Sequence, residues 1–188
     1  MSGLHRFVFE RSPIGPLTLE ASETGLTRVT FGAPTVVANA GEPVTASPGH
    51  PVLKPAGRAL GAYFGGDSDA LARLPVDLAG GTDFQQAVWR ALRTIPAGDV
   101  KSYGQIVRVI GRGSPRAVGQ AVGANPVPVV VPCHRVVAGD GRLGGFSGGL
   151  ERKVALLALE GIASEGARFD ARIRLDADAA LHALQPVR

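Results

Sequence analysis

The pattern of apolar residues changes at Gly80 and Gly81, and this change constrains the fold more than any other feature of the 188-residue chain. Before the two glycines, apolar and polar residues alternate over short runs, which is typical of strands buried on one face. After them, apolar residues recur at helical spacing. The sequence therefore predicts an α/β protein with a small antiparallel-sheet domain and a helix in residues 1–80, a mainly helical domain in 81–164, and an extension in 165–188.

Residues 1–80 predict a short sheet and one helix. Alternating runs at 7–10, 17–21 and 26–31 are separated by proline and glycine, so we expect antiparallel strands joined by turns. Residues 52–64 carry apolar side chains at helical spacing and are followed by Gly65, which predicts a helix that ends there. Residues 73–78 are a further strand candidate, and residues 35–51 are expected to form a surface loop that carries no chemistry.

Helices dominate the prediction for the rest of the chain. Each of the first three begins with a capping signal: Thr82 or Asp83, then Ser102, then Ser114 followed by Pro115. The predicted helices span 84–95, 103–110, 115–123 and 150–160. The second and third are joined by a glycine-containing turn, so they are a helix-turn-helix candidate, although such pairs are also ordinary packing units.

Charge is distributed unevenly along the chain. The net charge is +4, but residues 81–160 hold ten Lys and Arg against five Asp and Glu, whereas residues 1–80 hold six against seven. A local basic excess fits either a solvated surface or an anionic partner. The apolar runs are short and the N-terminal residues lack the apolar middle of a secretory signal, so we expect no membrane span and a cytoplasmic location.

The chain contains one cysteine, Cys133, and therefore forms no internal disulfide. This agrees with a reducing compartment and leaves the thiol free. The four histidines, His5, His50, His134 and His182, show none of the paired spacings of zinc ligands, so we expect no metal site and no cofactor.

Three prolines stiffen residues 125–137, which we expect to present Cys133 on a short apolar strand. His134 and Arg135 follow the thiol, and a base and a cation beside a thiol are expected to lower its pKa. Because neighbouring residues in a strand point to opposite faces, His134 would need a bend or a bridging water to reach the sulfur, with Glu160 a candidate to orient it. From the residues alone, a buried structural cysteine, a core histidine and a solvated glutamate are the simpler interpretations.

The segment from Pro132 to Val136, Pro-Cys-His-Arg-Val, resembles the active-site signature of the O6-alkylguanine-DNA alkyltransferases, also called methylated-DNA:protein-cysteine methyltransferases. Further segments match that family in order and spacing: 84–89, 102–105, 116–119, 125–128, 147–150 and 159–161. The resemblance covers about residues 84–161 and is weak before them. It implies a short antiparallel sheet with a helix, followed by the domain that carries the site.

The resemblance also implies roles for the matching residues. Cys133 would be the nucleophile, His134 its base through a water, Glu160 the holder of the imidazole, and Tyr103 a proton donor to the leaving guanine. Arg116 would enter the base stack. The implied DNA-contacting residues are Ser114, Arg116, Ala117, Gly119, Gln120, Tyr103 and Arg135, and the implied pocket residues are Asn125, which also braces the turn before the active-site segment, Pro128, Val136, Phe146 and Ser147. Phe146 stands where many relatives have tyrosine, so a phenolic contact is absent there.

The implied reaction is direct repair of DNA. A guanine inside a duplex hides its O6 atom, so the base must be flipped out at a cost of a few kcal/mol. Attack by the thiolate on the alkyl carbon of O6-alkylguanine, and we expect of O4-alkylthymine, leaves a stable thioether, so one molecule repairs one lesion. Contacts are expected with phosphate and sugar more than with base edges. The expected partner is double-stranded DNA, and we expect a monomer that requires no protein partner.

Three other functions fit part of this pattern. A binding-only relative recognises the lesion without removing it, but such proteins lack the reactive cysteine. A redox-sensing regulator would use one thiol beside a helix-turn-helix, yet the chain has no resolving cysteine. A cysteine hydrolase would use Cys133 and a histidine, but the sequence has no recognised oxyanion segment. Residues 165–188 extend past the resemblance and have no predicted function, apart from a plain surface helix at 176–184.

Overall fold

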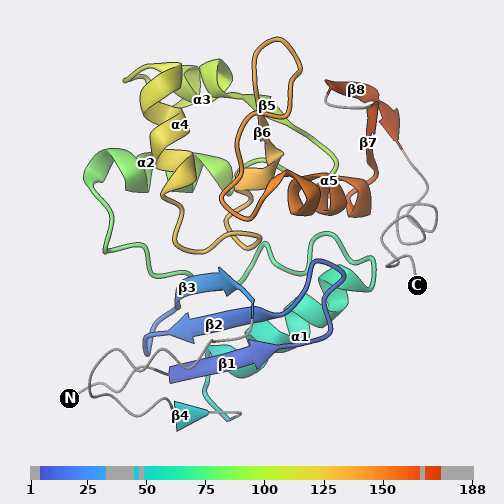
Figure 1. Ribbon diagram of the computed structural model, residues 1–188. Coiled ribbons are helices and arrows are strands. Elements are labelled where there is room, and N and C mark those ends of the chain that lie inside the picture. The colour runs from blue at the N-terminus through green and yellow to red at the C-terminus, as the bar shows by residue number, and fades with distance from the viewer. Residues whose placement is uncertain (1–4, 33–44, 47–48, 166–167, 175–188) are drawn as a thin grey trace. The chain divides into compact units, whose positions relative to one another are not determined.

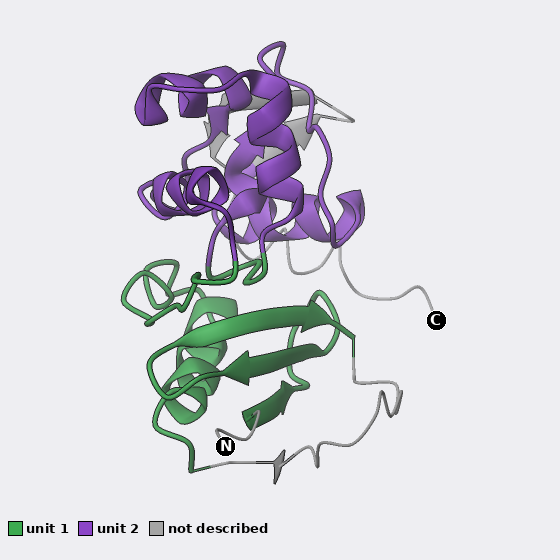
Figure 2. Cartoon of the chain, turned by 90° about the vertical axis from the view of Figure 1, so that its left-hand side faces the viewer, with its two compact units in different colours: residues 1–80, 126–130 green, residues 81–125, 131–188 purple. Residues whose placement is uncertain are grey.

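The computed structural model describes residues 5–32, 45–46, 49–165 and 168–174. Their contacts divide the chain into two compact units, which Figure 2 distinguishes by colour. Unit 1 comprises residues 1–80 with 126–130, and unit 2 comprises residues 81–125 with 131–188. Sequence reasoning placed residues 126–130 in the second domain, because a short proline-rich stretch does not reveal what it packs against. Within the described ranges, no helix is long and apolar enough to cross a membrane.

Unit 1 is a four-stranded sheet with one helix (Figure 1). The strands are β1 (His5–Phe9), β2 (Leu17–Ala21), β3 (Leu26–Phe31) and β4 (Thr45–Ala46), in the order β3-β2-β1-β4. β2 is antiparallel to both of its neighbours, and β4 is parallel to β1. Helix α1 (Leu53–Phe64) packs on this sheet through its apolar face. These elements confirm the antiparallel sheet and helix predicted for the first part of the chain.

The strand predicted at 73–78 is wrong. Residues 68–73 form consecutive turns, and only Val76 makes a bridge, parallel to Leu26. Leu71 lies in these turns and Leu74 directly follows them. Both are buried, but not through the alternation of a strand. Pro75 also has no N–H group to donate to a ladder. Much of the loop expected at 35–51 lies outside the described residues, although Thr45–Ala46 pairs as a strand.

Unit 2 is built on three helices that pack against one another: α2 (Asp83–Leu92), α3 (Tyr103–Ile110) and α4 (Pro115–Gly123). Thr82 and Ser102 each form a capping box with the glutamine three residues later, which satisfies the free N–H groups at these helix starts. Gly111 ends α3 with φ of 70°, a left-handed conformation that favours glycine. Buried Trp89 joins α2 to α4 because its Nε1 donates to the carbonyl of Ala121 at 2.8 Å.

The remaining elements of unit 2 surround the cysteine. Strand β5 (Lys101–Ser102) pairs in parallel with β6 (Val136–Val137), α5 (Leu150–Leu159) follows, and β7 (Ile162–Glu165) and β8 (Arg168–Arg174) form an antiparallel hairpin. The prediction that an apolar strand presents Cys133 is wrong, because residues 133–135 form a 3₁₀ turn, η1 (Cys133–Arg135). Prolines remove ladder donors from the preceding segment, and Val129 has φ of 75°. The helix predicted at 176–184 lies outside the described residues.

Candidate active site

A cavity of about 120 Å³ opens beside Cys133 in unit 2. This volume is below the roughly 300–1,000 Å³ of pockets for drug-sized ligands and is closer to the scale of a single ring system. The lining residues are Tyr103, Gly119, Val122, Gly123, Cys133, Gly145, Phe146 and Ser147. Two glycines on α4 leave room at the wall because they carry no side chain. Gly144 has φ of 65°, and a Cβ there would lie 2.7 Å from the phenol oxygen of Tyr103, so this loop position requires glycine.

The structure brings some of the sequence-predicted residues to this cavity and not others. Tyr103, Cys133, Phe146 and Ser147 line it, and so does Gly119, which was predicted as a DNA contact. Three predicted pocket residues are not among the lining residues: Asn125, Pro128 and Val136. Sequence reasoning missed Val122, Gly123 and Gly145 as cavity residues, because their small or apolar side chains carry no chemical signal.

The Cys133 thiol is protonated at neutral pH. Its side chain is almost fully buried, and this burial raises its pKa to about 11, while the Asn125 side chain, the Lys153 charge and local backbone hydrogen bonds act in the opposite direction. The expectation that the neighbouring His134 and Arg135 would lower this pKa is therefore wrong, because desolvation outweighs the nearby polar groups. A thiol of this kind needs a base when it reacts.

The imidazole of His134 is held in place by a buried glutamate. Its imidazole is completely buried, and burial lowers its pKa, so the ring is neutral at neutral pH. Nε2 lies 2.9 Å from Oε1 of Glu160. Burial acts to raise the pKa of Glu160, but the hydrogen bonds from His134 and Arg135 and the positive charge of Arg135 lower it to about 2. An ionised carboxylate only accepts hydrogen bonds, so Nε2 carries the ring proton and Nδ1 presents a lone pair.

The other ring nitrogen of His134 is available for proton transfer. Nδ1 is buried and has no hydrogen-bond partner among the described residues. The 3₁₀ turn at 133–135 supplies the bend that an extended strand would not, so adjacent side chains need not point to opposite faces. A neutral imidazole with a free lone pair can act as a general base.

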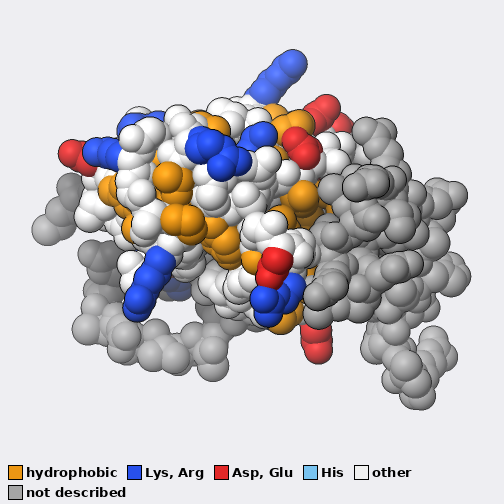
Figure 3. All heavy atoms as spheres, turned by 90° about the horizontal axis from the view of Figure 1, so that it is seen from above, with side chains coloured by type: hydrophobic (Ala, Val, Ile, Leu, Met, Phe, Trp, Pro, Cys, Tyr) orange, Lys and Arg blue, Asp and Glu red, His pale blue; other side chains and the backbone are white. Residues whose placement is uncertain are grey.

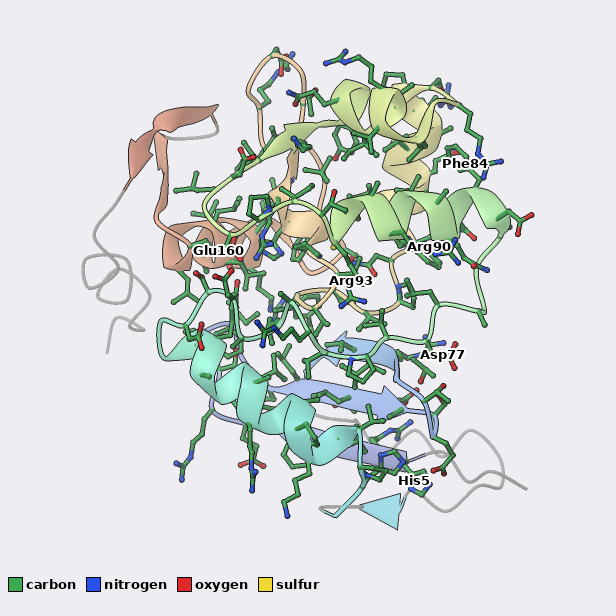
Figure 4. The ribbon with its side chains drawn as sticks, turned by 180° about the vertical axis from the view of Figure 1, so that it is seen from behind. His5, Asp77, Phe84, Arg90, Arg93 and Glu160 are labelled. Carbon is green, nitrogen blue, oxygen red and sulfur yellow. The ribbon has the colours of Figure 1, made fainter. Side chains whose placement is uncertain are left out.

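Arg135 binds Glu160 and is not placed to contact DNA. Its side chain is buried, and its Nε and Nη2 atoms donate to Oε2 and Oε1 of Glu160 at 2.9 and 2.8 Å. Nη1 donates to the carbonyl of Ile95. The predicted DNA contact by Arg135 is therefore wrong. The two-point contact instead fixes the carboxylate that orients His134, and Figure 4 labels Glu160 at the end of α5.

Asn125 and Val136 are bonded within the protein rather than exposed in the cavity. The Nδ2 atom of Asn125 donates to the carbonyl of Val131 at 2.8 Å, and this contact spans residues 126–130. The N–H group of Val136 donates to the carbonyl of Cys133, and its own carbonyl accepts from Nζ of Lys153. Pro128 lies in the segment that belongs to unit 1. These contacts explain why Asn125 and Val136 support the active-site segment without lining the cavity.

Tyr103 retains its phenolic proton at neutral pH. Burial and the charge of a Cys133 thiolate raise its pKa, while a backbone hydrogen bond at Gly145 opposes the rise. Tyr103 is the first residue of α3, directly after the Ser102 cap, and its side chain forms one wall of the cavity. A protonated phenol at this wall can donate a hydrogen bond to a bound base.

The outer face of α4 is open to solvent. Ser114, Arg116 and Gln120 are exposed, and Ala117 and Gly119 are half-buried. The opposite face is buried through Val118, Ala121 and Val122. Figure 3 views the end of unit 2 that carries α3 and α4, where lysine and arginine side chains border hydrophobic atoms, with some acidic side chains among them. Such a surface favours an anionic partner with apolar parts, as nucleic acid has.

A second cluster lies in unit 1. The candidate ligand atoms of His5, Glu23 and His50 lie within 4.8 Å of one another, and Nε2 of His5 is 3.6 Å from Oε1 of Glu23. Nδ1 of buried His50 accepts from the N–H group of Val52. Histidine and carboxylate groups are zinc ligands, so these residues could hold a metal ion. Sequence reasoning, which expected no metal site, missed the set because its members come from separate turns and strands.

Comparisons with known proteins agree with the geometry. Two models of one family match the chain: 6-O-methylguanine DNA methyltransferase, ribonuclease-like domain, over residues 6–78, and 6-O-methylguanine DNA methyltransferase, DNA binding domain, over residues 83–162. A methylated-DNA--protein-cysteine methyltransferase from Mycobacterium tuberculosis is 46% identical over 155 residues, which cover 79% of this chain and 88% of the relative. A relative of the same name from Methanosarcina acetivorans is 42% identical over 158 residues, which cover 82% and 96%.

A solved structure extends the likeness to three dimensions. The crystal structure of Mycobacterium tuberculosis OGT in complex with DNA superposes with a TM-score of 0.72 at 40% sequence identity. The match covers 94% of this chain and 98% of that chain. The sheet unit and the helical unit therefore both have counterparts in a known fold.

Proposed function

The chain belongs to the 6-O-methylguanine DNA methyltransferase family and repairs alkylated DNA by transferring the alkyl group to a cysteine of its own, and we propose that this cysteine is Cys133. One observation carries the assignment: the only thiol in the sequence lines a cavity on the scale of one ring system. The donor is the O6 atom of a guanine that has been turned out of the duplex, because that atom is inaccessible in the base stack.

The proposed chemistry uses the hydrogen-bond arrangement around His134. His134 takes the thiol proton at Nδ1 through a bridging water, while Glu160, itself bonded to Arg135, holds the ring. The thiolate attacks the alkyl carbon in line with the bond to O6. A carbon–sulfur bond forms, the carbon–oxygen bond breaks, and its electron pair leaves with guanine. Tyr103 gives its phenolic proton to the leaving guanine and regains one from solvent, while His134 releases the thiol proton to solvent. The resulting thioether cannot return to a thiol unaided.

The proposed DNA contacts lie on α4 and at its start. Exposed Arg116 enters the space that the flipped base leaves in the stack. Ser114, Ala117, Gly119 and Gln120 follow the same surface along the helix, and the positive end of the helix dipole at Ser114 favours a phosphate. Most contacts are therefore with the backbone of the DNA, which suits lesions that arise in any sequence.

Several finer points belong to the same proposal. O4-alkylthymine is a second substrate, because it presents the same alkyl–oxygen bond in a flat ring. The protein acts as a monomer in the cytoplasm, without a cofactor or a required protein partner. Sedimentation of the protein alone and with a duplex oligonucleotide measures the stoichiometry directly.

Methyl transfer to Cys133 tests the proposal. The protein is incubated with a duplex oligonucleotide that contains O6-methylguanine, and intact mass with peptide mapping locates the product. We expect one added methyl group on the peptide that carries Cys133 and an equal amount of restored guanine. Unmodified protein beside persistent lesion would favour a binding-only function instead.

Cys133→Ala separates transfer from binding. This variant removes one small buried atom group, so the fold and the DNA affinity should be retained while transfer is abolished. Binding is measured by fluorescence anisotropy on the same O6-methylguanine duplex. Residual repair by the variant would show that another residue is the acceptor.

A further inference from the structure

Lys153 is a fully buried lysine in the middle of α5. No carboxylate of the described residues forms an ion pair with its ammonium group, although burying a charge costs several kcal/mol unless it is compensated. Burial accordingly lowers the pKa of Lys153 to about 8, and the charge of a Cys133 thiolate acts against that shift. A methionine would fill similar space without this cost, so the charge itself calls for an explanation.

The ammonium group bonds the segment after Cys133 to the loop that forms the cavity. Nζ donates to the carbonyls of Val136 in β6 and Leu143, and the carbonyl of Gly145 lies 3.4 Å away. Leu143 is itself buried in a cluster with Leu157 and Ile162. The loop continues directly into the cavity wall formed by residues 145–147. One side chain therefore fixes the distance between the active-site segment and that wall.

The positive charge of Lys153 also acts on both partners in proton transfer. It favours the ionised form of Cys133, where it opposes the burial that raises the thiol pKa. It disfavours the protonated form of His134, so it helps to keep the base neutral. The other groups that act on the thiol are Tyr103 from α3, the amide of Asn125 after α4, and His134 in η1. None of these three carries a positive charge at neutral pH.

We propose that Lys153 is a positioning residue for the transfer reaction, whose buried ammonium fixes the cavity loop to the segment after Cys133 and stabilises the negative charge that forms on the sulfur. The inference rests on the proposed role of Cys133 as the acceptor. Lys153 does not touch the base, and it acts through the thiolate and the carbonyls that it binds. This role explains why a charged side chain without a carboxylate partner among the described residues occupies the core of unit 2.

Alkylation of the Cys133 thiol by iodoacetamide tests, in the absence of DNA, whether the charge of Lys153 stabilises the thiolate. Because Cys133 is the only cysteine in the chain, intact mass reports this one sulfur. We expect Lys153→Met to raise the thiol pKa by about one unit and to slow the reaction at neutral pH by about threefold to tenfold, because a more basic thiolate is scarcer but more nucleophilic. The matched control is Arg152→Met, which removes a charge from the neighbouring position of α5.

Two further variants separate charge from hydrogen bonding. Lys153→Gln keeps donor hydrogens and loses the charge, so it should react as slowly as Lys153→Met, whereas Lys153→Arg keeps the charge and should recover part of the rate. Circular dichroism and urea unfolding establish that each variant is folded. Equal iodoacetamide rates in the wild type, Lys153→Met and Lys153→Gln would overturn the inference, and so would loss of folding in all three variants.

The same proteins are assayed for methyl transfer from the O6-methylguanine duplex. A larger loss in transfer than in iodoacetamide reactivity is expected, because the duplex assay also needs the cavity wall in place. If the wild type transfers methyl but the variants keep the wild-type thiol reactivity, only the role of Lys153 fails. If the wild type transfers none, the proposed function fails and the inference with it.

Discussion

Glu160 is the residue at which the stability and the chemistry of unit 2 depend on the same atoms. One carboxylate accepts from the imidazole of His134 and twice from the guanidinium of Arg135, and all three side chains are buried. Removing one member of such a set leaves an uncompensated charge in the core, which typically costs about 3–5 kcal/mol. The carboxylate must also stay ionised to hold the imidazole with its lone pair at Nδ1.

Acid should destabilise the protein through this carboxylate. The pKa of Glu160 is lowered from 4.5 to about 2, so its contribution is fully present above pH 4.5 and is lost as the pH falls toward 2. The shift corresponds to about 3 kcal/mol of unfolding free energy. We expect Glu160→Gln to be much less stable than the wild type at about pH 6 and less different at about pH 3, as measured by urea unfolding.

The control for this prediction lies on the same helix. Glu151 is an exposed carboxylate in the first turn of α5, so Glu151→Gln should change stability little at either pH. A stability difference between the wild type and Glu160→Gln that does not change with pH would contradict the ionised state assigned to this residue. Repair by Glu160→Gln should fall as well, because an amide can present its NH₂ group to Nε2 and invert the ring's proton arrangement.

Site residues could be predicted from the sequence where a motif contained them, but not where packing determines which way a side chain faces. Cys133, His134 and Glu160 were selected from the sequence, and the structure bonds His134, in the same turn that carries Cys133, to Glu160. Arg135 was assigned to DNA although it faces inward, because sequence adjacency does not give side-chain direction in a 3₁₀ turn. Lys153 was not singled out, since a lysine in a helix is ordinarily solvated and nothing local in the sequence reveals that it is buried.

At the scale of elements, capping residues were the most informative signals. Ser102 and Ser114 mark the starts of α3 and α4 at the residues predicted, because a side chain that satisfies a helix's first N–H groups has few alternatives. The segment 126–137 was less predictable. Its valines suggested a strand, but its prolines and the left-handed conformation of Val129 produce turns. The hydrogen bonds of these turns go to residues that are distant in the sequence: the carbonyl of Pro126, for example, accepts from the N–H group of Val29.

The first turn of α4 supports a prediction about base flipping. Arg116 is exposed two residues after the Ser114 cap, and we propose that it fills the stack after the base leaves. A single strand has no stack to fill, so Arg116→Ala should slow repair of an O6-methylguanine duplex by about tenfold or more while slowing repair of the single strand much less. Single-turnover rates on the two oligonucleotides give the comparison.

A matched arginine outside α4 provides the reference. Arg90 is exposed on α2 and bonds to Gln86 of the same helix, so Arg90→Ala removes a charge without altering the α4 surface. Its effect on the two substrates should be small and equal. Equal slowing of duplex and single-strand repair by Arg116→Ala would count against the stack-filling role and leave a simple charge effect.

At the scale of the whole molecule, the charge distribution and the division into units coincide. The ten basic residues against five acidic ones at 81–160 fall in the part of the chain that holds the cavity, apart from the uncharged segment 126–130 that belongs to unit 1. Each phosphate neutralised by a protein cation releases counterions, so affinity for duplex DNA should fall linearly on logarithmic axes as salt rises, with a slope of about 0.9 per contact. Unit 1, with six basic and seven acidic residues at 1–80, should contribute little.

Charge-neutralising pairs in the two units measure this division. Replacing exposed Arg108 of α3 and exposed Arg112, which follows α3, together by glutamine should reduce the salt slope by up to about 1.8, the value for two phosphate contacts. Replacing exposed Lys54 and Arg58 of α1 in the same way should leave the slope unchanged. Anisotropy titrations over a series of salt concentrations give each slope. Equal reductions for both pairs would mean that the net charge of the protein, rather than a surface on unit 2, governs its attraction to DNA.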